Sequence, residues 1–422
     1  MNLSIIGAGY VGLVTGACFA KLGHQVICVD LDERKIDTIN RGRSPLYEAA
    51  LGELLSTFRD NIEATTDYDY ALNNSEVTFI CVGTPAQRDG SIDLSHVRAA
   101  AEELGRSLKE KVGWHLVVVK STVLPGTTQN VVLPLLEQDS GKRAGIDFGL
   151  AMNPEFLREA VSVNDFLNPD RIVIGFYDER SRDVLRELYK PFFCPTVETS
   201  LSAAEMIKYA SNAFLAAKIS FINELGNLCK RIGVDTYEVA EGLGYDKRIG
   251  RAFLDSGIGW GGSCFPKDLH ALIAWARELG EAPTLLEQVV AVNERQPLKL
   301  IELLKRHLPD LNGRTIGVLG LAFKPGTDDV RESRAIPVVH HLIEEGAVVK
   351  AYDPAAMEHF KQLFPGIVYC GTAEEALLAD AVLILTNWEQ FRALDYTGKT
   401  VIDGRRLEVA RKAAKRYEGV CW

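Results

Sequence analysis

The sequence predicts an α/β protein in which two doubly wound parallel sheets are joined by a long central helix. Three observations support this prediction. Short apolar runs alternate with helical patterns in the first part of the chain, the alternation stops in the middle, and it resumes near the end. Because 422 residues exceed what one hydrophobic core normally organises, we expect separate domains.

Residues 1–200 are expected to form the first domain. Their apolar runs are short and are separated by helical segments, as in a parallel sheet that is covered on both faces. In chain order the runs read LSIIGAG, QVICVD, VTFICVG, HLVVVKST, FGLAMNPE and RIVIGF.

Residues 201–300 show helical periodicity without a strand-like interruption. The first stretch, LSAAEMIKYASNAFLAAKISFINELGNLCKRIG, predicts one long helix, and DLHALIAWARELG and TLLEQVVAVNERQPLKLIELLKRHL predict further helices. We expect this part to connect the two sheets and to form a contact surface between subunits.

Residues 313–422 return to the strand and helix pattern, with a helix expected near Ala335 to Glu345. Here TIGVLGLAF parallels LSIIGAGYV of the first domain, VVKAYD parallels VICVD, and AVLILTN parallels VTFICVG. The sequence therefore predicts two related, Rossmann-like domains.

Composition and charge narrow the class of protein. Hydrophobic residues make up 47% and charged residues 25%, which is typical of a soluble globular protein, and the net charge of -10 argues against nucleic-acid and membrane partners. The eight cysteines lack the spacing of zinc or iron–sulfur ligands, so no metal site is expected. Without a basic leader or a membrane-length apolar run, we expect a cytoplasmic protein with reduced thiols.

The glycine-rich stretch GAGYVG follows the first strand and precedes a helix. This spacing allows a pyrophosphate to sit on the helix N-terminus. Asp30, at the end of the second strand, is placed to bond ribose hydroxyls and to repel a 2′-phosphate, which favours NAD over NADP, although Arg34 and Lys35 argue the other way. The dinucleotide loop consists of Gly7, Gly9, Tyr10, Val11 and Gly12.

Polar residues follow three strands of the first domain, where open parallel sheets bind their ligands. They occur in VGTP, KSTV and NPEF. Thr84 could simply cap a helix, whereas Thr122 and Glu155 are expected at the edge where the nicotinamide lies. On the long helix, Lys208 and Asn212 are four residues apart, either as a solvated pair or as cleft residues that stabilise a developing oxyanion.

The stretch GWGGSCFPKD places Cys264 between glycines and an expected helix start. A thiol next to Lys267 and a helix N-terminus can become a thiolate, and Asp268 lies four residues along the same face. The alternative is a small cysteine buried in a turn.

The second domain replaces the glycine fingerprint with FKPGTDDVRESR. Its cations Lys324, Arg331 and Arg334 indicate a site for a phosphorylated ligand, to which DGRR would add Arg405 and Arg406, although a solvated loop is the alternative.

Taken in order, GAGYVG, VGTP, STV, NPEFLREA, GWGGSCFPKD and FKPGTDDVRES resemble the nucleotide-sugar 6-dehydrogenases over nearly the whole chain. The pair GGSCFPKD and NPEFLRE is specific to these enzymes, and DFLNPDRIVIG favours the UDP-glucose 6-dehydrogenases among them. The resemblance implies that NAD binds the first domain, that UDP-glucose binds the second, and that the long helix forms a homodimer.

The resemblance also implies roles for individual residues. It makes Cys264 a nucleophile surrounded by Lys208, Asn212 and Asp268, and it makes Thr122 and Glu155 the pair that handles water. Near NAD, besides the glycine loop and Asp30, it places Lys35, Thr84, Thr122, Glu159, Lys267 and Arg331. Near UDP-glucose it places Glu155, Phe156, Leu157, Arg158, Lys208, Asn212, Phe253, Gly261, Lys324 and one of Arg405 or Arg406, with Arg248 from the neighbouring subunit.

One position departs from the family, because Ala160 stands where glycine is common. This departure matters only if the backbone there needs a positive φ.

The implied chemistry explains the cysteine. Oxidising an alcohol to an acid takes two hydride transfers, and Cys264 would hold the aldehyde as a thiohemiacetal and then as a thioester that water cleaves. Two alternatives stay open. The same chemistry could act on GDP-mannose or a UDP-N-acetylhexosamine, or the chain could be a catalytically silent NAD-binding scaffold, against which the joint presence of Cys264, Lys208, Asp268 and Glu155 argues.

Overall fold

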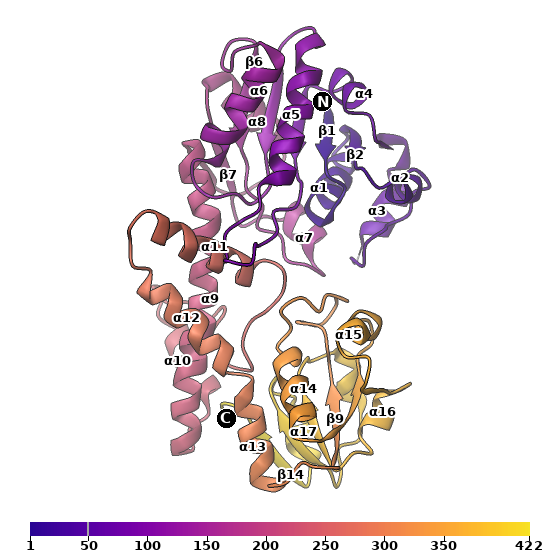
Figure 1. Cartoon of the computed structure of the whole chain (residues 1–422), viewed down its shortest axis with the longest axis vertical. Coiled ribbons are helices and arrows are strands. Elements are labelled where there is room, and N and C mark those ends of the chain that lie inside the picture. The colour runs from indigo at the N-terminus through magenta and orange to yellow at the C-terminus, as the bar shows by residue number, and fades with distance from the viewer. Residues whose placement is uncertain (49) are drawn as a thin grey trace. The chain divides into compact units, whose positions relative to one another are not determined.

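The structure is a computed structural model of the chain that describes residues 1–48 and 50–422 (Figure 1). These residues form two compact units. The first contains Met1–Ser211 and His270–Trp275, and the second contains Asn212–Leu269 and Ala276–Trp422. The division falls within one helix, α9 (Leu201–Ile232), which contributes to both units.

An eight-stranded sheet organises the first unit, with strand order β3-β2-β1-β4-β5-β6-β7-β8. Neighbouring strands pair in parallel, except that β7 runs antiparallel to β6, where Met152 faces Gly175. The strands are β1 (Asn2–Ile6), β2 (Gln25–Val29), β3 (Ile62–Thr65), β4 (Val77–Ile80), β5 (His115–Val119), β6 (Phe148–Met152), β7 (Ile172–Phe176) and β8 (Thr196–Thr199).

Helices cover both faces of this sheet, and the sheet separates two hydrophobic cores (Figure 1). Successive strand residues point to opposite faces, so Ile5 packs in the core that contains Phe19 of α1, whereas Ile6 packs with Leu104 of α5. The helices are α1 (Tyr10–Lys21), α2 (Glu33–Asn40), α3 (Leu51–Thr57), α4 (Tyr68–Asn73), α5 (Ser95–Glu110), α6 (Leu133–Ser140), α7 (Ser162–Leu167) and α8 (Glu179–Tyr189), with a π-helical turn at Thr128–Val132 before α6.

Helices dominate the middle of the chain, as predicted. The 32 residues of α9 include no proline, and the helix runs without a break. It is followed by α10 (Thr236–Gly244), α11 (Phe265–Glu278), α12 (Thr284–Arg295) and α13 (Leu298–His307). Among the described residues, no helix is both long and apolar enough to cross a membrane.

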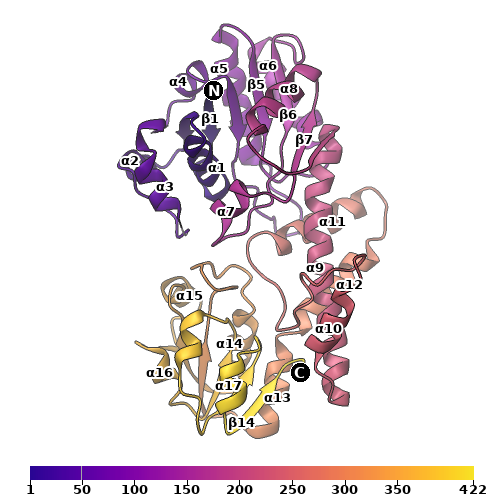
Figure 2. The same ribbon diagram turned by 180° about the vertical axis from the view of Figure 1, so that it is seen from behind.

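A six-stranded parallel sheet follows in the second unit, with strand order β11-β10-β9-β12-β13-β14. This order repeats that of the first six strands of the other sheet, which confirms the predicted relation between the two halves. The strands are β9 (Thr315–Leu319), β10 (Val348–Tyr352), β11 (Val368–Tyr369), β12 (Ala381–Ile384), β13 (Thr400–Asp403) and β14 (Arg416–Gly419). Figure 2 shows the helices around it, α14 (Ala335–Glu344), α15 (Met357–Leu363), α16 (Ala373–Ala376) and α17 (Glu408–Ala413).

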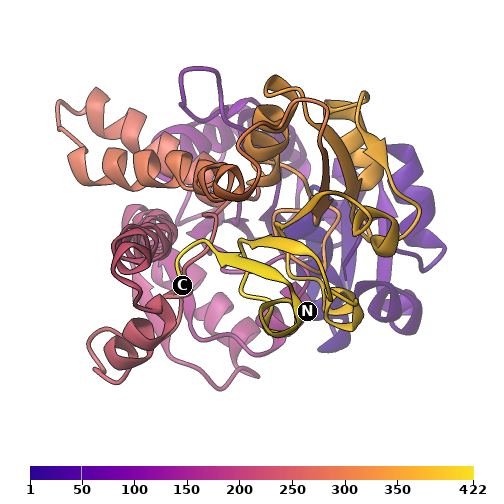
Figure 3. The same ribbon diagram turned by 90° about the horizontal axis from the view of Figure 1, so that it is seen from below.

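The last residues of the chain return to the helices of the second unit (Figure 3). Lys230 of α9 donates a hydrogen bond to the carbonyl of Trp422 at 2.9 Å. A Cβ atom on Gly226 of the same helix would lie 2.6 Å from Sγ of Cys421, so only glycine permits this close packing.

Candidate active site

The loop after β1 has the shape of a dinucleotide site. Gly7 has a φ of +98°, and a Cβ atom on Gly12 would lie 1.9 Å from the carbonyl oxygen of Gly7. At Gly9, by contrast, no described atom outside the adjacent residues lies within 4 Å of the Cβ position. The first glycine thus makes the turn, the third lets α1 approach, and the second leaves the backbone open to a pyrophosphate.

Asp30 anchors this loop. Its Oδ2 atom accepts a hydrogen bond from the backbone N–H of Ala8 at 2.9 Å and lies 3.2 Å from Nζ of Lys35, whereas Arg34 is exposed and pairs with Asp32. A cavity of about 700 Å³ opens beside the loop, and its acidic lining consists of Asp30, Asp67, Asp69 and Glu103. Four carboxylates against the already paired Lys35 favour a cofactor without a 2′-phosphate.

The second sheet has a matching aspartate that is not available to a ligand. Asp353 follows β10 as Asp30 follows β2, but it is fully buried. Its Oδ2 atom accepts hydrogen bonds from the N–H of Leu321 at 2.7 Å and from the indole of Trp388 at 3.0 Å. The protein itself therefore occupies the position that a ribose would need.

Glu155 and Lys208 form a buried ion pair at the carboxyl edge of the first sheet. Nζ of Lys208 lies 2.9 Å from Oε1 of Glu155, and the N–H of Leu157 donates to Oε2 at 2.5 Å. Burial would raise the pKa of Glu155, but the charge of Lys208 and these hydrogen bonds outweigh it, and the pKa is lowered. Lys208 and Asn212 are 3% and 6% exposed, so the alternative of a solvated pair is wrong.

Polar contacts also fix the neighbouring loops. Thr84 is buried and donates to the carbonyl oxygen of Thr122 at 2.9 Å. Lys120, which sequence reasoning missed, is buried and donates to Oδ1 of Asn153 at 2.8 Å. Burial lowers the pKa of Lys120 to about 8. Its position directly after a strand was the only available signal.

The segment after Glu155 is held by a further residue that the sequence did not single out. The N–H of Ala160 donates to Oε2 of Glu48 at 2.7 Å and the N–H of Ser162 donates to Oε1 at 2.9 Å, while Tyr10 also bonds to Glu48. Ala160 has a φ of +67°, so the condition under which its departure from glycine matters is met.

Cys264 lies immediately before α11, at a helix N-terminus. Its carbonyl oxygen accepts from the N–H of Asp268 at 2.9 Å, and the residue is partly exposed, with Sγ 3.6 Å from Oγ of Ser263. By contrast, burial raises the pKa of Cys18 and Cys421 to about 12. Cys264 is therefore placed where a helix N-terminus stabilises negative charge.

Asp268 is surrounded by polar partners. It is 1% exposed, accepts from Nδ2 of Asn212 at 2.6 Å and lies 2.5 Å from Nζ of Lys267. The structure thus groups Cys264, Lys267, Asp268 and Asn212 in the second unit and Thr84, Thr122, Glu155 and Lys208 in the first, with Lys208 and Asn212 on successive turns of α9.

The cysteine loop packs against the basic loop of the second sheet. The N–H of Gly262 donates to the carbonyl of Arg331 at 3.0 Å, and a Cβ atom on Gly261 would lie 2.1 Å from the carbonyl oxygen of Glu332. A cavity of about 190 Å³ lies beside them, and its lining includes Gly257, Gly261, Phe265, Phe323 and Arg405.

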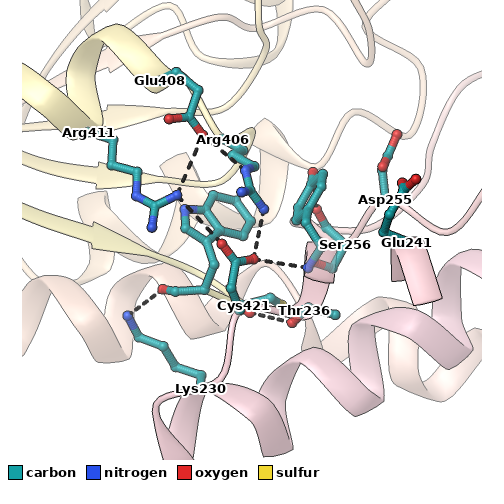
Figure 4. A network of polar contacts seen from close by, with 12 residues as sticks. Lys230, Thr236, Glu241, Asp255, Ser256, Arg406, Glu408, Arg411 and Cys421 are labelled. Carbon is teal, nitrogen blue, oxygen red and sulfur yellow. Dashed lines mark hydrogen bonds and ion pairs between the residues drawn. The ribbon is translucent and has the colours of Figure 1, made fainter. Parts of the chain in front are cut away.

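The two adjacent arginines behave differently. Arg405 lines this cavity and donates from Nε to the carbonyl of Leu385 at 2.7 Å; burial lowers its pKa to about 10, which leaves it charged. Arg406, with a φ of +55°, belongs to the network in Figure 4, where it pairs with Asp235 at 2.7 Å and with Glu408. Arg406 also stacks on Tyr237, with its guanidinium carbon 4.0 Å from the ring centroid.

The other predicted residues lie nearer the surface. Arg158 and Arg331 are exposed and pair with Asp165 and Asp329, and Arg248 pairs with Asp246 beside α9. Nζ of Lys324 is 5.4 Å from the ring centroid of Phe323. The remaining five, Val11, Phe156, Leu157, Glu159 and Phe253, are partly buried.

The described part of the chain contains no group of three or more His, Cys, Asp or Glu side chains that could hold a metal ion.

Comparisons with known proteins identify the family. Three models of the UDP-glucose/GDP-mannose dehydrogenase family match: the NAD-binding domain at residues 1–193, the central domain at 202–295 and the UDP-binding domain at 317–408. The chain belongs to this family. It is therefore an NAD-dependent dehydrogenase, as predicted, and NAD is its cofactor.

Individual relatives cover its full length. The chain is 50% identical to a UDP-glucose 6-dehydrogenase of Haloferax volcanii and 38% identical to a GDP-mannose 6-dehydrogenase of Pseudomonas aeruginosa, with 100% of each chain covered. A solved UDP-glucose dehydrogenase of Pyrobaculum islandicum is 46% identical and superposes with a TM-score of 0.96, covering 100% of this chain and 98% of the other.

Proposed function

We propose that the protein oxidises UDP-glucose to UDP-glucuronate with two NAD, through a covalent intermediate on Cys264. The observation that carries this proposal is the partly exposed residue Cys264 at the N-terminus of α11, one turn before the buried Asp268. A dehydrogenase that only interconverts an alcohol and a carbonyl needs no such thiol. The balanced reaction is UDP-glucose, two NAD⁺ and water giving UDP-glucuronate, two NADH and three protons.

The first unit would hold NAD. Bound NAD accepts one hydride in each oxidation step. The open backbone at Gly9 fits the pyrophosphate. Asp30 fits the adenosine ribose, because its Oδ1 atom accepts the N–H of Asp32 at 3.0 Å and a carboxylate oxygen can accept a second hydrogen bond. Thr122 and Glu155 follow neighbouring parallel strands, so they lie at the same edge as the glycine loop.

The residues around the sugar would move protons and stabilise charge. Lys208 and Asp268 would stabilise and deprotonate the C6 hydroxyl as hydride leaves, and the Cys264 thiolate would then attack the aldehyde carbon. The second hydride transfer leaves a thioester. Because the pKa of Glu155 is lowered, it is a carboxylate at neutral pH and can accept a proton from the water that cleaves the thioester, with Thr122 orienting that water.

The second unit would hold the nucleotide diphosphate. We assign this role to Arg405 and Lys324, together with the backbone of Gly261 and the ring of Phe253, because Arg405 keeps its charge at the cavity wall while Arg406 is engaged by Asp235 and Glu408. The predicted domains stay part of the proposal: an NAD-binding domain (1–200), a helical connector and dimer interface (201–300), to which Phe253 and Gly261 belong, and a UDP-sugar-binding domain (313–422).

We further propose a homodimer through the outer face of α9. Phe214 and Phe221 of this helix are 67% and 53% exposed, and with Leu285 they line an apolar groove of about 390 Å³. Arg248 lines the same groove, which would allow it to reach the sugar nucleotide of the other subunit.

A cytoplasmic location is part of the proposal. The described residues contain no disulfide, although eight cysteines are present.

A kinetic survey with NAD tests the substrate. UDP-glucose is expected to give a higher kcat/KM than GDP-mannose or a UDP-N-acetylhexosamine, with two NADH formed per UDP-glucuronate. The higher identity to UDP-glucose enzymes favours this choice over GDP-mannose. A single NADH per turnover with a free aldehyde product would contradict the two-step mechanism, and no turnover with any nucleotide sugar would favour the silent scaffold.

A further inference from the structure

Glu205 is a fully buried carboxylate on the second turn of α9. Each of its oxygens accepts one backbone hydrogen bond from the loop that leaves β5. The N–H of Gly126 donates to Oε2 at 2.6 Å and the N–H of Thr128 donates to Oε1 at 2.8 Å. The carboxylate therefore holds two points of one loop at once.

The loop needs this partner because it begins a helix. Thr128 opens the π-helical turn that continues into α6, and the first N–H groups of a helix have no acceptor within it. A carboxylate there also meets the positive end of the helix. Burial raises the pKa of Glu205, and the hydrogen bonds from Thr128 and Gly126 oppose this shift by favouring the charged form.

The other end of the same loop is Thr122. Its carbonyl oxygen accepts from Thr84 at 2.9 Å, and the preceding Ser121 donates to the carbonyl of Val82 at 2.7 Å. Thr122 is thus held between an anchor at the end of β4 and the Glu205 anchor on α9. Leu124, between the two anchors, packs beside Tyr209 of α9.

Glu205 and Lys208 are three residues apart on α9 and therefore share a face of the helix. Lys208 carries the ion pair with Glu155 on this face. One helix face thus fixes both the loop of Thr122 and the carboxylate proposed to receive the proton from water.

We propose that Glu205 is a positioning residue for the water-dependent step, acting by holding the Thr122 loop in register with the Glu155–Lys208 pair. The chemical consequence rests on the proposed function. The two hydrogen bonds by which Glu205 holds the loop at Gly126 and Thr128, called the clamp below, do not depend on it. A purely structural role would make Glu205 matter for stability and leave thioester cleavage alone.

The decisive variant is Glu205→Gln, which keeps the shape but offers a single acceptor and turns an NH₂ group toward one of the two N–H donors. Amide hydrogen exchange at Gly126 and Thr128 is expected to become roughly 10-fold faster or more, while amides of α8 do not change. Because small misplacements of reacting groups are costly, kcat is expected to fall by up to about 100-fold, with the KM values for NAD and UDP-glucose nearly unchanged.

The covalent intermediate distinguishes positioning from stability. In Glu205→Gln, slowed hydrolysis should give a burst of NADH and a sugar adduct on Cys264 by mass spectrometry. The double variant with Thr122→Ala should be no slower than Thr122→Ala alone, because Glu205 acts through Thr122. The matched control is Asp178→Asn, which removes a carboxylate cap from Ser181 of α8 in the same unit and should leave the burst and kcat as in the natural chain.

Each of the other outcomes overturns one named part of the proposal. Unchanged exchange at Gly126 and Thr128 would refute the clamp, and faster exchange with normal kcat and no adduct would refute positioning. Glu205→Asp, which keeps the charge but is one methylene shorter, should give the same effects more weakly, and it carries the test if the glutamine variant does not fold. If the natural chain did not oxidise UDP-glucose, the proposed function would be wrong. Amide hydrogen exchange at Gly126 and Thr128 would still test the clamp.

Discussion

Nζ of Lys208 lies 2.9 Å from Oε1 of Glu155, and both side chains are at least nine-tenths buried. Removing one partner of such a pair leaves the other charge buried and uncompensated. The pair therefore links the stability of the first unit to the ionisation of a proposed catalytic carboxylate.

Lys208→Met is expected to lower the free energy of unfolding by about 3–5 kcal/mol at pH 7. In the natural chain the lowered pKa of Glu155 contributes stability that is present above its unfolded pKa and is lost as the pH falls through its folded pKa. In the variant only the hydrogen bond from Leu157 and the charge of Lys120 would oppose burial, so the pKa of Glu155 should rise and acidification should favour the folded state. The difference in the free energy of unfolding between the natural chain and Lys208→Met, measured by denaturation, should therefore be smaller at pH 5 than at pH 7.

The control for this prediction is Arg158→Met, which breaks the more exposed pair with Asp165 at 2.7 Å. It should cost no more than about 1 kcal/mol. If the difference in free energy of unfolding between Lys208→Met and the natural chain stayed constant with pH, Glu155 would not titrate as proposed.

Asp30→Ala is expected to relax the choice of cofactor. Without the aspartate, Lys35 loses the partner that lies 3.2 Å away and can meet a 2′-phosphate. The ratio of kcat/KM for NAD to that for NADP should fall by roughly 10-fold or more, corresponding to about 1.4 kcal/mol. Removing Lys35 as well should reverse the gain for NADP, and a natural chain equally efficient with both cofactors would refute the role of Asp30.

Ala160→Gly is expected to stabilise the chain by up to about 1 kcal/mol. Ala160 has a φ of +67°, which costs a residue with a Cβ atom roughly 1–2 kcal/mol. Glycine removes this cost, but part of the gain is lost because glycine has more conformational freedom in the unfolded chain. Chemical denaturation measures the change. Ala282→Gly, at an exposed position without a positive φ, should instead destabilise, and a similar loss at Ala160 would contradict the argument from strain.

Arg405 and Arg406 form a matched pair for the nucleotide site. Arg405→Met should weaken UDP-glucose binding by about 1.5–3 kcal/mol with NAD binding unchanged, because a charge-assisted hydrogen bond is lost. Arg406→Met should mainly lower stability, because it leaves Asp235 with fewer partners. Calorimetry for binding and denaturation for stability separate the two effects, and the reverse pattern would exchange the assignments.

This pair also shows how far the sequence could be read. The glycine loop, the succession of strands and helices and the place of Cys264 before a helix follow from local spacing, and the structure agrees with them. The choice between Arg405 and Arg406 depends on one positive φ and on Asp235, which lies 171 residues away in the chain. No local pattern encodes that contact.

The same limit applies to the residues that sequence reasoning missed. Glu48 and Glu205 are ordinary glutamates by their neighbours, and only the fold shows that each accepts two backbone N–H groups from a distant loop. The antiparallel pairing of β7 is equally invisible, because RIVIGF fits either direction. Local periodicity thus predicts elements and loop chemistry, whereas the contacts that aim a side chain are tertiary.

Cys264→Ala and Cys264→Ser test the covalent mechanism. Without the thiol, overall formation of UDP-glucuronate should be lost, while NAD and UDP-glucose still bind, because neither the loop at Gly9 nor Arg405 depends on the sulfur. The serine variant should stall after the first oxidation or at an ester, since an oxygen ester is a poorer acyl donor than a thioester, and a sugar adduct should then be visible by mass spectrometry.

Replacing another partly exposed cysteine gives the control. Cys194 lies in the first unit, and Cys194→Ser should leave turnover unchanged. If Cys264→Ala formed UDP-glucuronate at close to the natural rate, the helix N-terminus of α11 would not be the site of a nucleophile. The polar group of Asn212, Lys267 and Asp268 would then act on the sugar hydroxyl without covalent help, and the aldehyde would have to be held by binding alone.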